Sequence, residues 1–173
     1  MQITDAVQAH VQTRSFGTDP QVPGQVLVTD GLRVFGHREL AFAVAGEARV
    51  EPLVPLLRAI ASAAEHGMGV QVGGVTRLGG PLQFGGPGPG FQGVVYARPS
   101  AMDGLIDAEG LVGLLVAPTE LDMVEAFGLR RVLSRLAQTH CYYPYPPWSD
   151  PARPRLSANL DEGSLLHLSL IPI

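Results

Sequence analysis

The side chains that most often perform catalysis or hold metal ions are sparse in this chain and poorly spaced for either task. The five histidines are His10, His37, His66, His140 and His167. No two of them have the HxxxH spacing that brings two imidazoles to one face of a helix. His140 and Cys141 are adjacent, but two neighbours at a helix end usually cannot both reach one metal ion. The sequence therefore predicts no metal site and no cofactor.

Nucleophilic catalysis finds no clear candidate either. Cys141 is the only cysteine, and no neighbouring feature marks it as a thiolate. Because there is only one cysteine, the chain can form neither an intramolecular disulfide nor a metal site with several cysteines. All twelve cationic residues are arginines, which excludes Schiff-base lysines and a P-loop lysine. We predict no catalytic residue, and a non-enzymatic role is favoured while a small enzyme stays open.

Glycine and proline are concentrated in residues 79–93, GGPLQFGGPGPGFQG. A phosphate-binding glycine loop should follow a strand and open a helix. This segment leads into another strand instead, and its prolines remove amide donors that would bind phosphate. We interpret it as a loop whose aromatic side chains, Phe84 and Phe91, are candidates for a binding site.

Aromatic residues gather in residues 142–154, YYPYPPWSDPARP. Tyrosine and tryptophan supply large contact areas with few rotatable bonds, and prolines reduce the ordering that binding requires. Tyr142, Tyr143, Tyr145 and Trp148 are therefore candidate protein-binding residues. The alternative is structural, with the segment laid across a sheet and Trp148 plugging the core.

Composition limits the class of protein. Of 173 residues, 46% are apolar and 16% are charged, so we expect one ordered domain rather than a disordered chain. The net charge of −4 argues against nucleic-acid binding, which needs clustered cations. The N-terminus has no apolar signal-peptide core, and no apolar run approaches a membrane span. We predict a cytoplasmic protein that binds neither nucleic acid nor membrane.

Periodic apolar residues predict the strands. Asp30-Gly31 lies between two β-branched or aromatic runs and predicts a hairpin with strands near 25–29 and 32–36. Further strands are expected at 39–45, 70–78, 93–97 and 111–117 and at the C-terminal SLLHLSLIPI. Residues 1–24 are polar, with weak helical spacing. In the strand at 39–45, alternation puts Leu40, Phe42 and Val44 on one side.

Two helices are expected. Residues 51–66 have apolar residues at helical spacing, and Pro52 and Pro55 fall in the first turn, where proline is tolerated. The second helix starts with Thr119 as N-cap and Asp122 as capping-box acid, and continues through Gly128 to His140. More strands than helices predict an α+β fold, a mainly antiparallel sheet with two principal helices packed on it.

Three stretches together resemble the suppressor of fused (SUFU-like) domain family. The first is RELAFAVAGEARVEPLVPLLRAIASAAEHG, a strand followed by a proline-containing entry to a helix. The second is VGGVTRLGGPLQFGGPGPGFQGVVYARP, a glycine-proline loop before a strand. The third is LVGLLVAPTELDMVEAFGLRRVLSRL, an apolar strand and a threonine-initiated helix. The resemblance covers residues 38 to about 136 and stops before the aromatic segment.

The resemblance implies a bacterial member of the family with one SUFU-like α+β domain over residues 1–173. Residues 1–24 would be a polar N-terminal segment and 142–155 an aromatic and proline-rich segment. It also implies a non-enzymatic domain that binds another protein, such as an immunity or sequestering protein in a bacterial toxin system. No binding residue can be carried over from the family.

Two other hypotheses stay open. A small-molecule-binding protein or small enzyme would have its pocket between the 79–93 loop and the 142–154 segment, lined by His140, Tyr142 and Trp148. A homodimer would form through the apolar C-terminal strand, because natural proteins rarely leave such an edge exposed.

Overall fold

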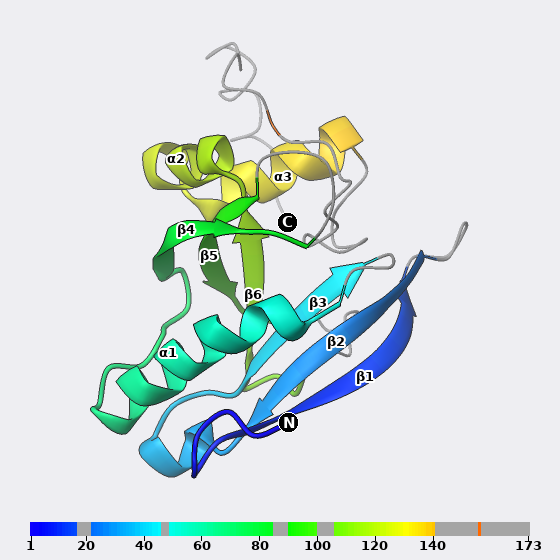
Figure 1. Ribbon diagram of the computed structural model, residues 1–173. Coiled ribbons are helices and arrows are strands. Elements are labelled where there is room, and N and C mark those ends of the chain that lie inside the picture. The colour runs from blue at the N-terminus through cyan, green and yellow to red at the C-terminus, as the bar shows by residue number, and fades with distance from the viewer. Residues whose placement is uncertain (17–21, 46–48, 85–89, 100–105, 141–155, 157–173) are drawn as a thin grey trace.

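The computed structural model describes residues 1–16, 22–45, 49–84, 90–99, 106–140 and 156. These form one six-stranded sheet in the order β1-β2-β3-β6-β5-β4 (Figure 1). The strands are β1 (Gln8–Phe16), β2 (Val22–Asp30), β3 (Leu40–Ala45), β4 (Val75–Leu82), β5 (Phe91–Ala97) and β6 (Leu111–Val116). All neighbours pair antiparallel except β3 and β6, which are parallel. The predicted α+β class with a mainly antiparallel sheet is confirmed.

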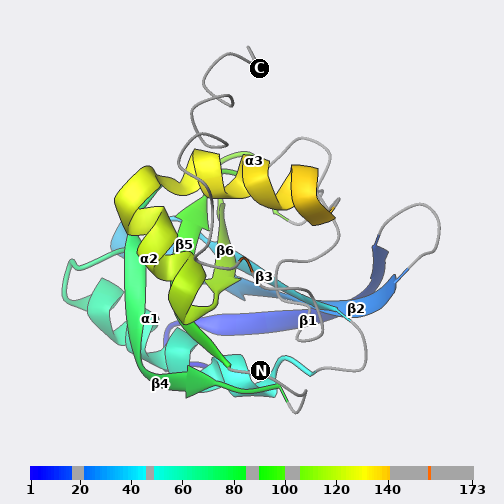
Figure 2. The same cartoon turned by 90° about the horizontal axis from the view of Figure 1, so that it is seen from above.

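Helices cover both faces of the sheet. Helix α1 (Val54–Glu65) packs on one face, while α2 (Pro118–Phe127) and α3 (Leu129–His140) pack on the other (Figures 1 and 2). Two short 3₁₀ helices complete the described elements, η1 (Leu32–Phe35) and η2 (Glu51–Leu53). None of the helices in the described ranges is both long and apolar enough to cross a membrane.

Strand β3 shows how alternation divides the core. Leu40, Phe42 and Val44 belong to the cluster beneath α1, as the alternation predicts. The intervening alanines, Ala41 and Ala43, belong to the cluster beneath α2 and α3. The sheet is therefore the middle layer of three, with an apolar core on each side.

Helix α1 confirms the helix predicted for residues 51–66. Pro52 and Pro55 lie in η2 and in the first turn of α1, where their missing amide protons remove no helical hydrogen bond. Its buried stripe consists of Leu56, Leu57, Ile60, Ala61 and Ala64. Gly67 follows with φ +78°, a left-handed conformation that suits glycine after a helix.

Two predictions near the N-terminus are wrong. Residues 8–16 form β1, not a weak helix, because all nine pair in register with β2. Residues 32–35 form η1 rather than the second strand of a hairpin, so β2 pairs with β3 across a longer connection. Gly31 has φ +118°, and the Cβ atom of any larger residue at this position would lie only 2.3 Å from the carbonyl oxygen of Ala6. The Asp30-Gly31 turn signal thus opens a helical turn, not a two-residue hairpin.

The strand predicted at 70–78 is displaced toward the C-terminus. It begins at Val75, after Gly73 has turned the chain with φ +76°, and it continues through Pro81 to Leu82. The first and last residues of the loop predicted for 79–93 therefore belong to β4 and β5. Residues 85–89, between them, lie outside the described ranges.

The helix predicted for 119–140 is divided in two at Gly128, which has φ +85°. The predicted caps are also wrong by two positions, because Pro118 occupies the first turn and Ala117 is the N-cap. The capping acid is Glu120, not Asp122, and its Oε2 accepts the Ala117 amide at 2.9 Å. The predicted C-terminal strand, SLLHLSLIPI, lies outside the described residues.

Candidate protein-interaction surfaces

The aromatic candidates from the sequence are only partly placed. Tyr142, Tyr143, Tyr145 and Trp148 lie outside the described residues, as does Cys141. Their role in binding stays a prediction, and so does the pocket that they and His140 would line. Only Phe84 and Phe91 among the proposed site residues have described surroundings.

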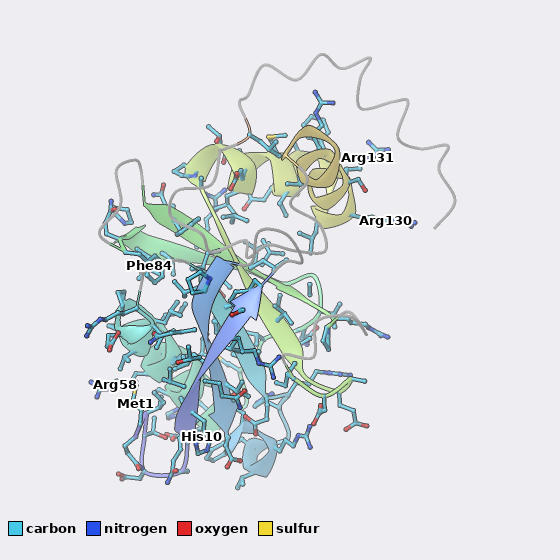
Figure 3. All side chains as sticks on the ribbon, turned by 90° about the vertical axis from the view of Figure 1, so that its right-hand side faces the viewer. Met1, His10, Arg58, Phe84, Arg130 and Arg131 are labelled. Atoms are coloured by element: carbon cyan, nitrogen blue, oxygen red, sulfur yellow. The ribbon has the colours of Figure 1, made fainter. Side chains whose placement is uncertain are left out.

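Phe84 and Phe91 contact each other at the β4–β5 end of the sheet. Their ring centroids are 6.0 Å apart and the rings meet edge to face at 67°. Phe91 is fully buried in the core beneath α1, and Phe84 is half-buried against the same cluster. Phe84 is therefore the one that retains accessible surface, and Figure 3 shows its place on the molecule.

The connection from α1 to β4 exposes three apolar side chains within eight residues. Met68 is 66% exposed, Val72 46% and Val75 37%. We call these three residues the α1–β4 patch. Single exposed apolar residues are ordinary, but a group of them often marks an interaction site. Figure 1 shows this connection rising from the end of α1 to the edge strand β4.

Backbone hydrogen bonds fix this connection to the sheet. The Gly73 amide donates to the Tyr96 carbonyl at 2.7 Å, and the Tyr96 amide donates to the Gly74 carbonyl at 3.1 Å. The Tyr96 hydroxyl lies 2.9 Å from the Thr76 hydroxyl of β4. Burial raises the pKa of Tyr96, while its hydrogen bond with Thr76 lowers it to a smaller extent. The patch is thus presented on a well-anchored turn.

Strand β4 is also joined to α2 by surface charges. The Arg77 guanidinium donates from Nε to Glu125 at 3.1 Å, and its Nη2 lies 3.6 Å from Asp122. The hydrogen bond with Glu125 is the main reason that the pKa of Arg77 is raised. All three side chains are largely exposed, so this contact positions β4 more than it stabilises the fold.

A shallow groove of about 430 Å³ lies at the opposite side of the sheet, where β1, β2 and η1 meet. On its rim, His10 faces Asp30 at 3.7 Å and Arg33 pairs with Asp107. The hydrogen bond from Arg33 is the main reason that the pKa of Asp107 is lowered. Each charged side chain on this rim that the structure describes has a polar neighbour, so the groove gives no clear signal for a charged ligand.

Glu39 lines this groove and is buried. Its Oε1 accepts the amides of Gly31 and Arg33 at 3.0 and 3.1 Å. Its Oε2 accepts the Thr29 hydroxyl at 2.7 Å. The carboxylate therefore supplies hydrogen-bond acceptors that a tight hairpin would take from its backbone. In this way it fixes the connection between β2 and β3.

Glu120 is a second buried carboxylate that sequence reasoning missed. Besides the Ala117 amide, it accepts the amide of Leu156 at 3.2 Å, and the Thr119 hydroxyl donates to the Leu156 carbonyl at 3.2 Å. Leu156 is buried in the core beneath α2 and α3. The start of α2 thus anchors the chain at the residue that closely follows the aromatic segment.

Metal coordination is not supported where side chains are placed. Within the described residues, no group of three or more histidine, cysteine, aspartate or glutamate side chains could hold a metal ion. The described residues offer exposed apolar side chains and strand edges, which are features that can bind another macromolecule.

Comparison with known proteins identifies the class of fold. No protein-family model and no curated protein sequence matches the chain. The crystal structure of Drosophila Suppressor of Fused is similar, with a TM-score of 0.54 and 20% identity over 75% of this chain and 38% of that one. The Sufu–Fu complex crystal structure is also similar, with a TM-score of 0.50 and 20% identity over 74% and 68% of the two chains.

These similarities show that the chain has a Suppressor of Fused-like fold, as the sequence resemblance implies. The chain spans 38% of the length of the Drosophila protein, so the two share a part of that protein's architecture.

Proposed function

We propose that this chain is a protein-binding domain and that the α1–β4 patch forms part of its contact surface. The observation that carries the proposal is that Met68, Val72 and Val75, all exposed, lie within eight residues along the connection from α1 into the edge strand β4, which is hydrogen-bonded to the sheet at Gly73 and Gly74. A rigid apolar surface loses little conformational freedom on binding, which favours a specific partner.

The shared fold supports the same proposal. One similar structure is a Sufu–Fu complex, so a protein with this fold takes part in a protein–protein complex. The partner of the present chain is not carried over from that likeness, because the identity is only 20%.

The predicted aromatic residues extend the proposed surface. Phe84 follows the end of β4 opposite Val75 and keeps accessible area, so we propose that it adds a second contact at the other end of this edge strand. Tyr142, Tyr143, Tyr145 and Trp148 follow α3, and we propose that they contact the partner as well.

A narrower form of the proposal is an immunity or sequestering protein in a bacterial toxin system. Its support is the net charge of −4, which would favour association with a basic protein. In that case binding should weaken as salt is raised, and the captured protein should carry a positive net charge. A salt-independent complex with an acidic partner would contradict this narrower form.

Substitution of the patch tests the main proposal. Val72→Asp should reduce capture of the specific partner from cells of the source organism at least tenfold, because it buries a charge in an apolar contact. The matched control is Ala59→Asp, which puts the same charge on another exposed apolar side chain, in α1. Equal recovery of the partner by Val72→Asp and the wild type, with both folded, would contradict the proposed surface.

A further inference from the structure

The outer edge of β1 shows which backbone groups face away from the sheet. The Ala9 amide donates to the Met1 carbonyl at 2.8 Å, and the Met1 amino group donates to the Ala9 carbonyl at 2.9 Å. Gln2 pairs with Gln8 in an antiparallel bridge. Met1 and Gln2 therefore lie along β1 on the side opposite β2, and both polar backbone groups of Ala9 point outward.

Alternation extends this assignment along the strand. In an antiparallel pair, every second residue turns its amide and carbonyl away from its partner strand. The register between β1 and β2 is unbroken from Gln8 to Phe16, so Val11, Thr13 and Ser15 share the orientation of Ala9. Their outward amides and carbonyls continue the same edge beyond the residues of β1 that pair with Met1 and Gln2.

Most side chains along this part of β1 are exposed among the residues that the structure describes. Val11, Thr13 and Ser15 are exposed on the α1 side of the sheet. On the other side, Gln12 is exposed and Arg14 is half-buried, and their side chains approach within 3.4 Å. Strand β1 contains no proline and no acidic residue. Figure 3 shows His10 and Met1 toward the same end of the molecule.

We propose that the edge from Val11 to Ser15 accepts an extended strand of a partner protein, antiparallel to β1 and in line with Met1 and Gln2. Strand addition of this kind obtains affinity from main-chain hydrogen bonds and specificity from alternate side chains. The added strand carries an apolar residue beside Val11 on one face and an acidic residue beside Arg14 on the other. The inference rests on the proposed protein-binding function but uses a different surface.

A second copy of the chain fits this edge less well. Its β1 could offer no acidic residue to Arg14, because β1 has none. Pairing through the short stretch from Val11 to Ser15 alone also buries much less area than a stable dimer, which needs roughly 1,200 Å² or more in total. The observations therefore favour a partner strand over a homodimer.

The first experiment measures the binding of a synthetic heptapeptide of alternating valine and glutamate to the full chain. Binding is monitored by the NMR shifts of the backbone amides. Saturable shifts of Val11, Thr13 and Ser15 are expected, with at least tenfold weaker binding of the matched valine–lysine peptide. Arg14→Glu should reverse this preference. An absence of saturable binding, or binding with no shift at these three amides, would overturn the proposal.

Proline substitution tests the main-chain contact. Thr13→Pro removes an outward amide that takes no part in the ladder with β2, so the peptide should bind at least tenfold more weakly. Thr13→Val keeps that amide and should bind normally. Unchanged peptide affinity in a folded Thr13→Pro variant would overturn the proposal. If the proline variant does not fold, the charge reversal at Arg14 decides the matter alone.

Light scattering distinguishes a second copy from a partner strand. A wild-type dimer that Thr13→Pro converts to a monomer would assign the edge to another copy and overturn the proposal. Failure of the peptide experiments combined with loss of partner capture in Val72→Asp would leave the protein-binding function standing and remove only the β1 edge from it.

Discussion

Strands β1 and β4 form the two edges of one sheet, but their sequences protect those edges to different degrees. Strand β4 has a register break between Arg77 and Leu82, a proline at position 81 and a charged side chain tied to α2. These are features that discourage another strand from pairing. Strand β1 keeps nine paired residues in unbroken register and has no proline.

The two proposed surfaces would use different modes of recognition. Near β4 the accessible features are the apolar side chains of the α1–β4 patch, whereas on β1 they are backbone amides and carbonyls. Side-chain contacts select a partner by shape, and main-chain contacts accept many sequences. A partner that touches both edges would therefore be recognised mainly at the β4 side.

The largest expected change in stability comes from proline substitutions in β1, which test which of its backbone amides face β2. Gln12 alternates with Val11 and Thr13, so its amide should point to β2, opposite Val26. We expect Gln12→Pro to lower the free energy of unfolding by about 3 kcal/mol or more, while Thr13→Pro lowers it by roughly 1 kcal/mol or less. Urea unfolding of both variants checks this. Equal losses at the two positions would contradict the assigned orientation.

The second-largest effect on stability is expected at Glu39, the buried carboxylate in the connection between β2 and β3. Glu39→Gln removes the negative charge that the Gly31 and Arg33 amides and the Thr29 hydroxyl face, so we expect a loss of about 1–3 kcal/mol in unfolding free energy. Glu109→Gln, at an exposed glutamate, is the matched control and should leave stability unchanged. Similar behaviour of the two variants in urea would show that Glu39 does not hold the β2–β3 connection.

A smaller loss of stability is expected where Tyr96 of β5 contacts β4. Tyr96→Phe removes the hydrogen bond to Thr76 and should lower the unfolding free energy by about 0.5–1.5 kcal/mol near pH 8. Because folding raises the pKa of Tyr96 above its ordinary value of 10.0, its protonated form stabilises the fold below that pH. This contribution is lost as pH rises through the folded pKa.

Unfolding in urea between pH 8 and pH 11 checks the sign of that dependence. The wild type should lose stability more steeply than Tyr96→Phe, since phenylalanine does not titrate. A steeper loss in the variant would contradict the assigned effect of burial on the pKa of Tyr96.

The smallest effect is expected at the surface of the β4 edge. Glu125→Gln weakens the contact with Arg77, but both side chains are largely exposed. We therefore expect no measurable change in thermal stability at 0.15 M salt. A clear loss would show that β4 depends on α2 more strongly than exposed charges imply.

The sequence predicted the regular elements because their apolar residues follow simple periods. The alternation of Leu40, Phe42 and Val44 and the apolar stripe of α1 both reappear in the cores. The SUFU-like resemblance also gave the right fold. These features depend on local spacing, which a single sequence displays directly.

The errors concern residues whose conformation depends on distant contacts. Gly31 opens η1 because it packs closely against Ala6, and Glu39 is buried because the amides of Gly31 and Arg33 converge on it. Gly128 ends a helix that local propensity alone would continue. The outward edge of β1 was missed because strand order, which identifies the edges, is not visible in spacing.

The central claim is that this domain binds a protein through the α1–β4 patch, and photo-crosslinking tests it most directly. A photoreactive amino acid at Val72, with one at Ala59 as control, would be activated in cells of the source organism. The account predicts one dominant crosslinked protein from position 72 and none from position 59. No crosslink at position 72, or the same products from both positions, would contradict it.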